Sequence, residues 1–311
     1  MGGRLIETLC ERGYSVKALA RSQTAEEKVS RAGAEPVKGD ISSVDRLTRG
    51  MEGCEVVFHA AALLDVWGRY EEFYQVNVVG TQNVIKSAKA AGVSRVVYVS
   101  AGAVLVNDRP VIDADETWPK PKRPFGAYAS TKAIAENLLL EANSAELTTV
   151  AVRPPAIWGK GDPSFLPVLA ESARKGLFVW IDGGRYLCVT CHVDNVCEGA
   201  ILAAERGRGG EAYFLTDGDP IELRDFWTGL LRTQGVEPTS LSVPRWAAWA
   251  AAALLEKLWH MFRLKGRPPI TREIIKLVGG PLTVRDDKAR RELGYTASMT
   301  REKGLAELAG D

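Results

Sequence analysis

The stretch MGGRLIETLCERGYSVKALA, residues 1–20, decides the fold class of this chain. Gly2 and Gly3 stand directly before a run with apolar residues at helical spacing, and Gly13 follows that run as glycine commonly follows a helix. Residues 14–20 then alternate like a strand. A helix that opens with glycines and leads into a strand is the second half of a phosphate-binding βαβ unit. The first strand of such a unit has no counterpart before Gly2, so we expect it to be missing from this sequence.

Strand-like and helical segments alternate through the first half of the chain. Four of the five strand-like segments are short apolar runs, which is typical of parallel strands buried on both faces. This order predicts an α/β fold built on a doubly wound parallel sheet. The expected strands are 15–20, 34–38, 55–59, 95–100 and 148–152, and the expected helices are 25–31, 44–50, 71–91 and 127–142.

The pattern becomes irregular after residue 155. We expect further strands near 186–193 and 212–216, a helix at 196–205, and mostly helical structure from Asp225 onward. Ligands bind such sheets outside the carboxyl ends of the strands. We therefore predict a dinucleotide-binding domain and a smaller substrate-binding lobe over those ends. The domain comprises residues 1–159 and 185–217, and the lobe comprises residues 160–184 and 218–311.

Composition excludes several classes of function. The 311 residues carry 40 Lys and Arg against 39 Asp and Glu, so no basic excess points to nucleic acid. The five cysteines have no metal-ligand spacing, and Cys188 and Cys191 should face opposite sides of a strand. No positively charged start followed by an apolar run is found, so we expect no secretory signal, and the longest apolar run, 246–255, is too short to cross a bilayer. We expect a cytoplasmic protein without a metal site.

The strongest chemical signal is Tyr128-Ala129-Ser130-Thr131-Lys132. Residues four apart share one face of a helix, so the phenol and the ammonium should point the same way. A nearby cation lowers the pKa of a phenol, which can then exchange a proton with an alcohol or ketone near neutral pH. Ser100 ends the expected strand 95–100 and could hold a carbonyl oxygen beside Tyr128. These three residues are the candidate catalytic set.

Several further motifs occur in a fixed order along the chain. They are Val37-Lys38-Gly39-Asp40, Val57-Phe58-His59-Ala60-Ala61, Asn77-Val78-Val79-Gly80-Thr81, the strand that ends in Ser100, Tyr128-x-x-x-Lys132, Arg153-Pro154-Pro155-Ala156-Ile157-Trp158-Gly159 and His192-Val193-Asp194-Asn195. With these motifs the chain resembles the extended short-chain dehydrogenase/reductase family, which belongs to the NAD-dependent epimerase/dehydratase superfamily. The likeness is closest to its 3β-hydroxysteroid dehydrogenase and dihydroflavonol reductase-like branch. It implies a Rossmann-like fold, a nicotinamide cofactor and a Ser-Tyr-Lys catalytic set.

One position departs from the family pattern. Many relatives carry two consecutive hydroxyl residues at the end of the serine strand, whereas Ser100 is followed by Ala101 here. We assign Ser100 as the catalytic hydroxyl because the Ser-Ala-Gly-x-Val order resembles the reductase-type pattern.

The resemblance also explains the opening of the chain. The phosphate loop of the family reads Thr-Gly-x-x-Gly-x-x-Gly, and its glycines let the backbone approach the pyrophosphate. Only the last glycine is present, as Gly2 with Gly3 beside it. We expect the first strand and the other loop glycines to lie outside this sequence, because of a misplaced start codon or because the chain is a fragment.

The residues after the second strand decide between the two nicotinamide cofactors. An acidic residue there would bind the ribose of NAD, whereas Arg21 and Ser22 supply a cation and a hydroxyl for a 2'-phosphate. NADP(H) is therefore predicted, with NAD(H) as the alternative. The resemblance implies further cofactor contacts from Asp40, Ile41, Ala60, Ala61, Ala62, Asn77, Ser100, Tyr128, Lys132, Pro154 and Pro155.

The late segment 244–259 is rich in tryptophan, alanine and leucine, which favours an apolar substrate. The chain is thus predicted to interconvert a secondary alcohol and a ketone on a hydrophobic, steroid-like molecule. A nucleotide-sugar epimerase or dehydratase, and a non-catalytic dinucleotide-binding regulator, remain as alternatives. The stripe Leu255, Trp259 and Phe262 predicts a helix packed on the lobe, and neighbouring cations leave open a helix on a membrane surface. The resemblance implies a homodimer formed through the helices 71–91 and 127–142.

Overall fold

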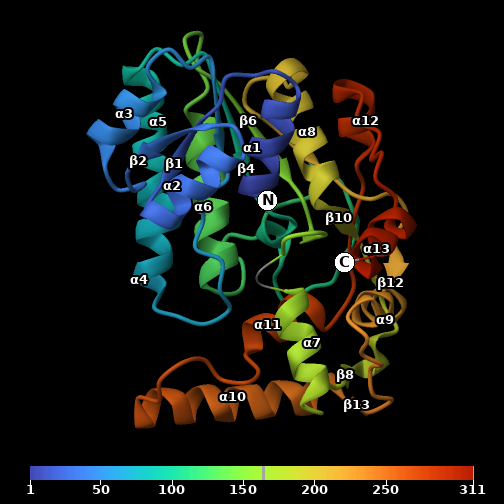
Figure 1. Ribbon diagram of the computed structural model, residues 1–311. Helices are drawn as coiled ribbons and strands as arrows, with labels where there is room; N and C mark the ends of the chain where they lie inside the picture. Colours follow the sequence, from blue (N-terminus) through green and yellow to red (C-terminus); the bar gives the residue numbers. More distant parts are fainter. Residues whose placement is uncertain (163–164, 311) are drawn as a thin grey trace.

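Figure 1 shows the computed structural model of the chain, which describes residues 1–162 and 165–310. At its centre is a parallel sheet in the order β3, β4, β6 and β11, and a separate parallel pair is formed by β1 and β2. The predicted α/β fold with a Rossmann-like parallel sheet is confirmed. The strands are β1 Lys17–Ala20, β2 Glu35–Lys38, β3 Val56–His59, β4 Arg95–Val99, β6 Thr148–Arg153 and β11 Glu211–Phe214.

Helices cover both faces of the central sheet, with α5 and α6 on one side of β4 and α8 on the other (Figure 1). Side chains of a strand alternate between its faces, so β4 serves two cores. Val96 and Tyr98 pack with α3, α5 and α6, while Val97 and Val99 pack with α8. The helices of this region are α1 Gly2–Glu11, α2 Gln23–Arg31, α3 Val44–Met51, α5 Gly80–Ala90, α6 Ala127–Glu141 and α8 Val193–Arg206.

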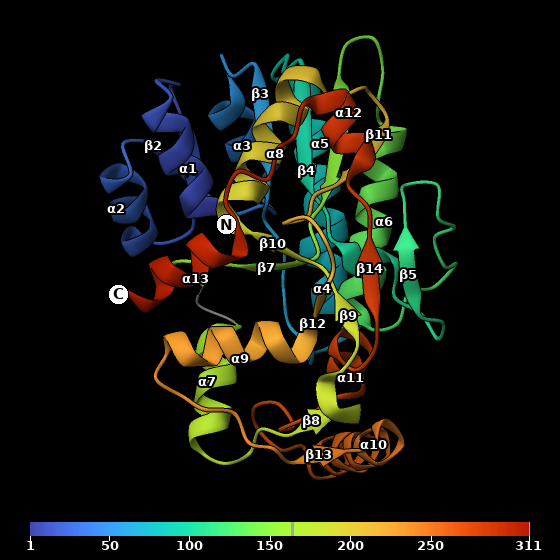
Figure 2. The ribbon, with the colours of Figure 1, turned by 90° about the vertical axis from the view of Figure 1, so that its right-hand side faces the viewer.

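The two sheets are not joined to each other. Among residues 1–162 and 165–310, no strand pairs with both β1 and β3, so the position of the expected first strand is unfilled there. Helix α1 packs between the β1–β2 pair and the helix α8 that covers the central sheet (Figure 2). Its Leu5 and Leu9 contact α8, whereas Ile6 and Cys10 pack with the residues of β1 and α2.

The helix predicted over 71–91 is confirmed as a continuous helical run, but its middle is a π-helix. The structure has α4 at Tyr70–Phe73, a π-helical segment at Tyr74–Val79, and then α5. A π-helical turn lies inside a longer helix and re-aims its side chains. Here it buries Asn77, whose amide bonds two other segments of the chain. The spacing of apolar residues in the sequence does not distinguish this π-helical segment from an α-helix.

The smaller lobe and the connecting segments add short strands and six further α-helices within the described part of the chain. A mixed sheet has the order β5, β14, β9 and β12, and two parallel pairs join β7 to β10 and β8 to β13. The elements are β5 Val111–Ala114, β7 Ala156–Trp158, α7 Leu166–Arg174, β8 Trp180–Ile181, β9 Leu187–Cys188, β10 Thr190–His192, β12 Ile221–Glu222, α9 Leu223–Thr233, β13 Ser242–Val243, α10 Arg245–Phe262, α11 Arg272–Val278, β14 Leu282–Val284, α12 Asp287–Leu293 and α13 Arg301–Ala309, with 3-10 turns at Gly102–Leu105 and Asp182–Gly184.

The single strand predicted over 186–193 is also wrong, because β9 and β10 belong to different sheets. Cys188 packs against the lobe core and Cys191 lies in the core of the central sheet, so the two thiols do face different sides. Trp158 and Trp180 are buried in the lobe core with Phe226 and Trp227, which places these tryptophans in packing.

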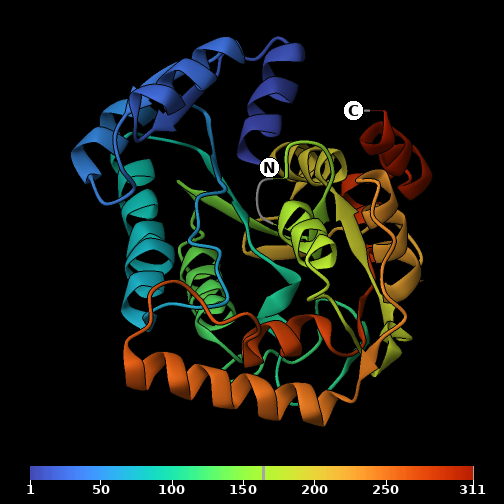
Figure 3. The same ribbon diagram turned by 60° about the horizontal axis from the view of Figure 1, so that its bottom comes forward.

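Helix α10 runs along one edge of the molecule (Figure 3). The prediction that Leu255, Trp259 and Phe262 form its packed stripe is wrong for Phe262, which is 64% exposed. The buried face consists of Ala248, Ala252 and Glu256, at a spacing of four residues. Small alanines let α11 approach closely, and Glu256 is buried because it bonds Arg272.

Candidate active site

The predicted site residues lie where parallel strands end. Arg21 follows β1, Asp40 follows β2 after Gly39, Ala60 follows β3 and Ser100 follows β4. Carboxyl ends of parallel strands meet at one edge of a sheet, which is where ligands bind doubly wound folds. Strand order thus places Ala60 and Ser100 side by side at the edge of the central sheet, and Arg21 and Asp40 side by side at the edge of the separate β1–β2 pair.

Helix α6 presents Lys132 to the end of β4. The Lys132 ammonium donates to the carbonyl oxygen of Val99 at 2.6 Å and lies 4.0 Å from the ring centre of Tyr98. The side chain is only 2% exposed. Burial lowers the pKa of Lys132 to about 7, although the Glu136 carboxylate opposes that effect. Lys132 is therefore held at the strand end that carries Ser100.

Tyr128 stands one turn before Lys132 and is partly exposed. Burial raises the pKa of its phenol above the ordinary value, and the nearby Glu273 carboxylate raises it further. The expectation that Lys132 lowers the pKa of Tyr128 is therefore wrong for the chain by itself. The Lys132 ammonium is directed to the Val99 carbonyl and is itself close to losing its charge at neutral pH. Tyr128 thus keeps its proton at neutral pH.

Ser100 is 4% exposed, and its hydroxyl has no hydrogen-bond partner among the described residues. Buried hydroxyls are usually bonded, and Ser100 does lie near the Glu136 carboxylate, whose pKa it helps to lower. Its backbone amide donates to Val152, which fixes the position of the residue. Nearby, the amide of Gly102 donates to the carbonyl of Pro154 at 2.8 Å, which holds the loop of Pro154 and Pro155 beside the serine strand.

A buried ion pair that the sequence did not reveal lies behind the helix. Glu136, fully buried one turn after Lys132, accepts two hydrogen bonds from Arg153 at 2.9 and 2.7 Å. Lys120 adds a third contact at 2.9 Å. Burial alone would raise the pKa of Glu136, but these cations lower it to about 2. The pair fastens α6 to β6. The four-residue spacing places Glu136 on the helix face of Lys132, but no local pattern links it to Arg153.

Asn77, predicted to contact the cofactor, is buried and bonded within the protein. Its amide nitrogen donates to the Thr131 hydroxyl at 3.0 Å, and its oxygen accepts from the Leu63 amide at 2.7 Å. It therefore joins the π-helical segment, the loop after β3 and α6. His59 nearby is buried and bonds Thr81, and burial lowers the pKa of its ring to about 3. His59 is a neutral core residue.

The residues predicted for the dinucleotide are more open to solvent. Gly2 and Gly3 are exposed at the start of α1, with no atom close to where a side chain would stand. Arg21 and Ser22 are exposed, and the Ser22 hydroxyl accepts from the Ala25 amide as the cap of α2. Hydrogen bonds from Ser42 lower the pKa of Asp40, with a smaller effect of Arg21.

The small residues after β3 are also accessible to a ligand. Ala61 and Ala62 are exposed, whereas Ala60 is half-buried. Ile41 is buried and packs against Gly80.

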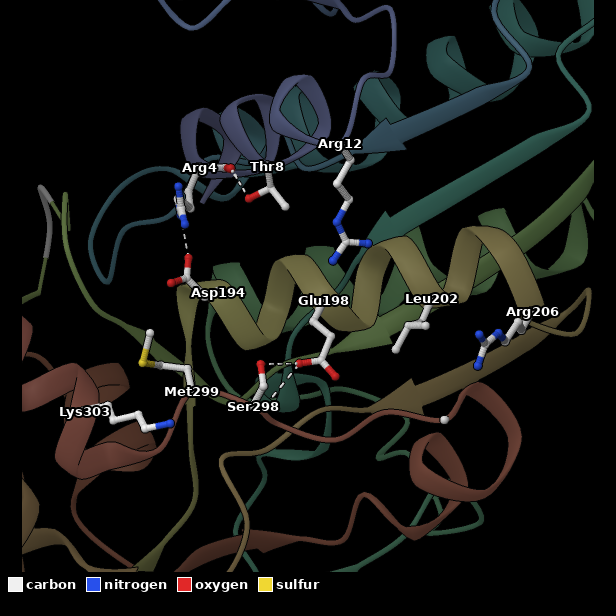
Figure 4. Close-up of a pocket in the computed structure, with 11 residues that line it drawn as sticks. Arg4, Thr8, Arg12, Asp194, Glu198, Leu202, Arg206, Ser298, Met299 and Lys303 are labelled. Atoms are coloured by element: carbon white, nitrogen blue, oxygen red, sulfur yellow. Dashed lines mark hydrogen bonds and ion pairs between the residues drawn. The ribbon is translucent and has the colours of Figure 1, made fainter.

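A separate groove of about 510 Å³ runs between α1, α8 and the segment 294–303. Figure 4 shows Arg4 of α1 meeting Asp194 of α8, an ion pair of 2.6 Å. On the far side, Glu198 accepts from Ser298. None of the candidate catalytic residues lines this groove. Asp194 therefore fastens α1 to α8.

The sequence of this chain matches one family along most of its length. The profile of the 3-beta hydroxysteroid dehydrogenase/isomerase family matches residues 1–245. The chain is 50% identical to a 4-hydroxy-2-methyl-3-oxo-4-farnesyl-3,4-dihydroquinoline-1-oxide ketoreductase of Stigmatella aurantiaca, over 99% of this chain and 92% of that protein. It is 36% identical to a 2-alkyl-3-oxoalkanoate reductase of Stenotrophomonas maltophilia, over 99% of this chain and 96% of that protein.

A solved structure also matches over the whole fold. The crystal structure of gox2253 superposes with a TM-score of 0.78 at 29% identity, covering 99% of this chain and 94% of that one. The arrangement of sheet, helices and smaller lobe is thus shared with a protein of known structure.

Proposed function

Because this chain belongs to the 3-beta hydroxysteroid dehydrogenase/isomerase family, within the extended short-chain dehydrogenases/reductases, we propose that it reduces a ketone of a hydrophobic substrate to a secondary alcohol. The predicted family and enzyme class are confirmed: the chain is a NAD(P)-dependent oxidoreductase of the extended short-chain type. The observation that carries the direction is the likeness to a ketoreductase and to a 2-alkyl-3-oxoalkanoate reductase, and the Tyr128 phenol on α6 is the group placed to give a proton. A protonated phenol is suited to giving a proton to a ketone oxygen.

In this proposal each catalytic side chain has one task. Tyr128 donates the proton to the carbonyl oxygen, and the Ser100 hydroxyl, directly after β4, orients that oxygen. Lys132 gives one hydrogen bond to Val99 and has further N–H groups for ribose hydroxyls. When bound, the reduced nicotinamide supplies the hydride.

The residues at the open edge of the sheet fit a dinucleotide. Gly2 and Gly3 leave room at the start of α1, where helix amides favour a phosphate. Arg21 and Ser22 are exposed beside β1, so we propose that they bind a 2'-phosphate and give NADP(H) the preference over NAD(H). The remaining contacts are proposed for Asp40, Ala60, Ala61, Ala62, Pro154 and Pro155, with Ile41 and Asn77 holding these segments in place from below.

The substrate class follows from the relatives. We propose that residues 160–184 and 218–311 form the substrate-binding lobe and that 1–159 with 185–217 bind the dinucleotide. The Stigmatella relative is a ketoreductase of a farnesylated quinoline oxide, and a prenylated or alkylated ketone is therefore the first class to test.

The test compares Tyr128→Phe with the unmodified protein in NADPH oxidation assays. The substrates are a 2-alkyl-3-oxoalkanoate and a prenylated cyclic ketone. UDP-glucose is supplied separately with NAD, and its products are separated by chromatography, because epimerisation and dehydration leave the cofactor with no net change in oxidation state. We expect ketone reduction to fall by roughly 10²- to 10⁴-fold in the variant, because it lacks the proton donor. Tyr70→Phe is the control, since Tyr70 is 44% exposed outside the site.

Retention of most ketone reduction by Tyr128→Phe would overturn the proposal. Turnover of the nucleotide sugar alone would support the epimerase or dehydratase alternative. A protein that binds NADPH and turns over none of the substrates would support the regulator alternative.

A homodimer is proposed from the family resemblance, through the helices over 70–90 and 127–141. Light scattering at micromolar concentration tests it, and a monomeric mass would contradict it.

Contact of α10 with anionic lipid is proposed on a separate observation. Of the fourteen large hydrophobic side chains exposed among the described residues, six lie within 241–264: Leu241, Trp246, Leu254, Met261, Phe262 and Leu264. Exposed cations follow at Arg263, Lys265 and Arg267, while the only acid of 244–267, Glu256, is buried against Arg272. Aromatic and basic groups on one surface suit an anionic bilayer. No helix of the described residues is long and apolar enough to cross a membrane.

Sedimentation with phosphatidylglycerol vesicles and with phosphatidylcholine vesicles tests this surface. We expect binding to the anionic vesicles alone, and loss of binding in Phe262→Glu. Equal binding by that variant, or concentration-dependent self-association that Phe262→Glu abolishes, would contradict the lipid assignment.

A further inference from the structure

Helix α6, which carries Tyr128 and Lys132, begins without a cap of its own. Its cap position is Gly126, which has no side chain, and its first turn contains no acidic residue. The first amides of a helix have no partner within the helix and must be satisfied from elsewhere. Those of Ala127 and Tyr128 are therefore in need of an acceptor.

The acceptor is Glu273, which comes from α11 in the C-terminal part of the chain. One of its carboxylate oxygens accepts the Tyr128 amide at 3.3 Å, across 145 residues of sequence. The Ala127 amide also hydrogen-bonds this carboxylate. Glu273 is only 9% exposed. It takes the place that an Asp or Ser normally occupies at the start of a helix.

Gly126 is shaped for this contact. Its φ is +93°, a backbone conformation that favours glycine. A side-chain carbon at this position would overlap the Glu273 carboxyl group. Glycine therefore permits both the turn and the close approach of the carboxylate.

Helix α11 is held firmly against its surroundings. Arg272 donates to Glu256 of α10 through its amide and its guanidinium, both at 2.7 Å. Ile275 is fully buried beside α10. Lys276 lies 5.5 Å from the ring centre of Phe125, directly before Gly126. The position of Glu273 is thus set by two neighbouring elements.

We propose that Glu273 is a positioning residue of the reduction: it caps α6 at Tyr128, and its ionisation weakens the Tyr128 phenol as a proton donor. Only the effect of Glu273 ionisation on the Tyr128 phenol rests on the proposed function. The capping role can be tested without any substrate.

The charges around Glu273 explain why its ionisation falls near neutral pH. Burial raises the pKa of Glu273 to about 7, against the two amide hydrogen bonds, which lower it. Asp65 and Glu256 face it and raise the pKa further. Tyr128 faces it from α6, and Arg272 and Lys276 are the cations of its own helix. As the pH rises through about 7, the new negative charge opposes loss of the phenol proton.

The first experiment measures amide hydrogen exchange of residues 127–129 in the full chain. We expect roughly fivefold faster exchange in Glu273→Ala, because a lost cap costs about 1 kcal/mol. Gly126→Ala should do the same, since it displaces the carboxyl group. Glu273→Gln keeps an oxygen acceptor and should stay close to the unmodified protein. Glu302→Gln, at an exposed position of α13, is the control. Unchanged exchange in Glu273→Ala would overturn the capping role.

The second experiment measures the pH dependence of kcat and KM for ketone reduction. In the unmodified protein we expect kcat to fall roughly three- to tenfold between about pH 6 and about pH 8, with little change in KM. In Glu273→Gln this fall should disappear, because the neutral amide cannot ionise. An unchanged fall in Glu273→Gln would assign the titration to Lys132 and overturn the effect of Glu273 ionisation on the phenol. Loss of the proposed function would instead be seen as unaltered turnover in Tyr128→Phe.

Discussion

The catalytic region around Tyr128 and Lys132 and the dinucleotide region around Arg21 and Ser22 differ in how tightly the surrounding protein holds their side chains. In the catalytic region, Lys132 and Glu136 are buried and bonded, and β4 is paired on both sides. In the dinucleotide region, the side chains are exposed and β1 is paired only with β2. The catalytic groups are therefore held by the protein alone. The dinucleotide region is less constrained, so changes there should alter cofactor affinity more than the catalytic geometry.

The largest effect is expected when the buried Glu136–Arg153 ion pair of the catalytic region is removed. Glu136→Ala removes the partner of Arg153, which is 3% exposed, and leaves a buried charge uncompensated. Breaking such a pair costs about 3–5 kcal/mol in the free energy of unfolding. Urea unfolding measures it, with Glu141→Ala at the exposed end of α6 as the control. A variant as stable as the control would show that the ion pair does not hold α6 in place.

The next effect is the contribution of Glu273 to the pH dependence of the free energy of unfolding. The pKa of Glu273 rises from 4.5 to about 7 on folding, so the folded state binds more protons between these values. Stability from this group is present below about pH 4.5 and is lost as the pH rises through about 7, by at most about 3 kcal/mol. Glu273→Gln should flatten that part of the curve in urea unfolding at several pH values. An identical slope in both proteins would contradict this assignment.

Adding the expected first strand and phosphate loop should strengthen cofactor binding in the dinucleotide region. Residues joined ahead of Gly2 that supply a strand between β1 and β3, followed by a Thr-Gly-x-x-Gly-x-x loop, would pair both free strand edges and offer amides to a pyrophosphate. We expect NADPH to bind such a chain at least about tenfold more tightly than the 311-residue chain, a difference of about 1.4 kcal/mol. Fluorescence titration compares the two. Equally tight binding by the 311-residue chain would show that it meets the pyrophosphate in another way.

The smallest effect tests cofactor choice. Arg21→Glu places a negative charge where the 2'-phosphate is proposed to bind, so the preference for NADPH over NADH should fall by roughly tenfold. Arg21 is the suitable position because Ala20 is only 1% exposed, and an acid there would be buried. Lys28→Glu, exposed on α2, is the matched control. An unchanged ratio of the two dissociation constants would assign no role to Arg21.

Several features were predictable from the sequence because local pattern determines them. Short apolar runs between helical segments define buried parallel strands, and the central sheet follows from them. Tyr128 and Lys132 share one face of α6 because they are four residues apart, a spacing that the helix itself imposes. The ordered motifs also predicted the family, which the match over residues 1–245 confirms.

Other features were decided only by the tertiary structure, because they depend on groups that are far apart in the chain. Glu273 reaches Tyr128 across 145 residues, and no local spacing announces that contact. The pKa of Tyr128 is raised because folding buries the phenol beside that carboxylate, whereas the spacing to Lys132 had predicted the opposite. Phe262 is exposed because the small face of Ala248 and Ala252 fits α11 better than the larger stripe. Periodicity determines which residues share a face, but burial and charge around that face are set by whatever the fold packs against it.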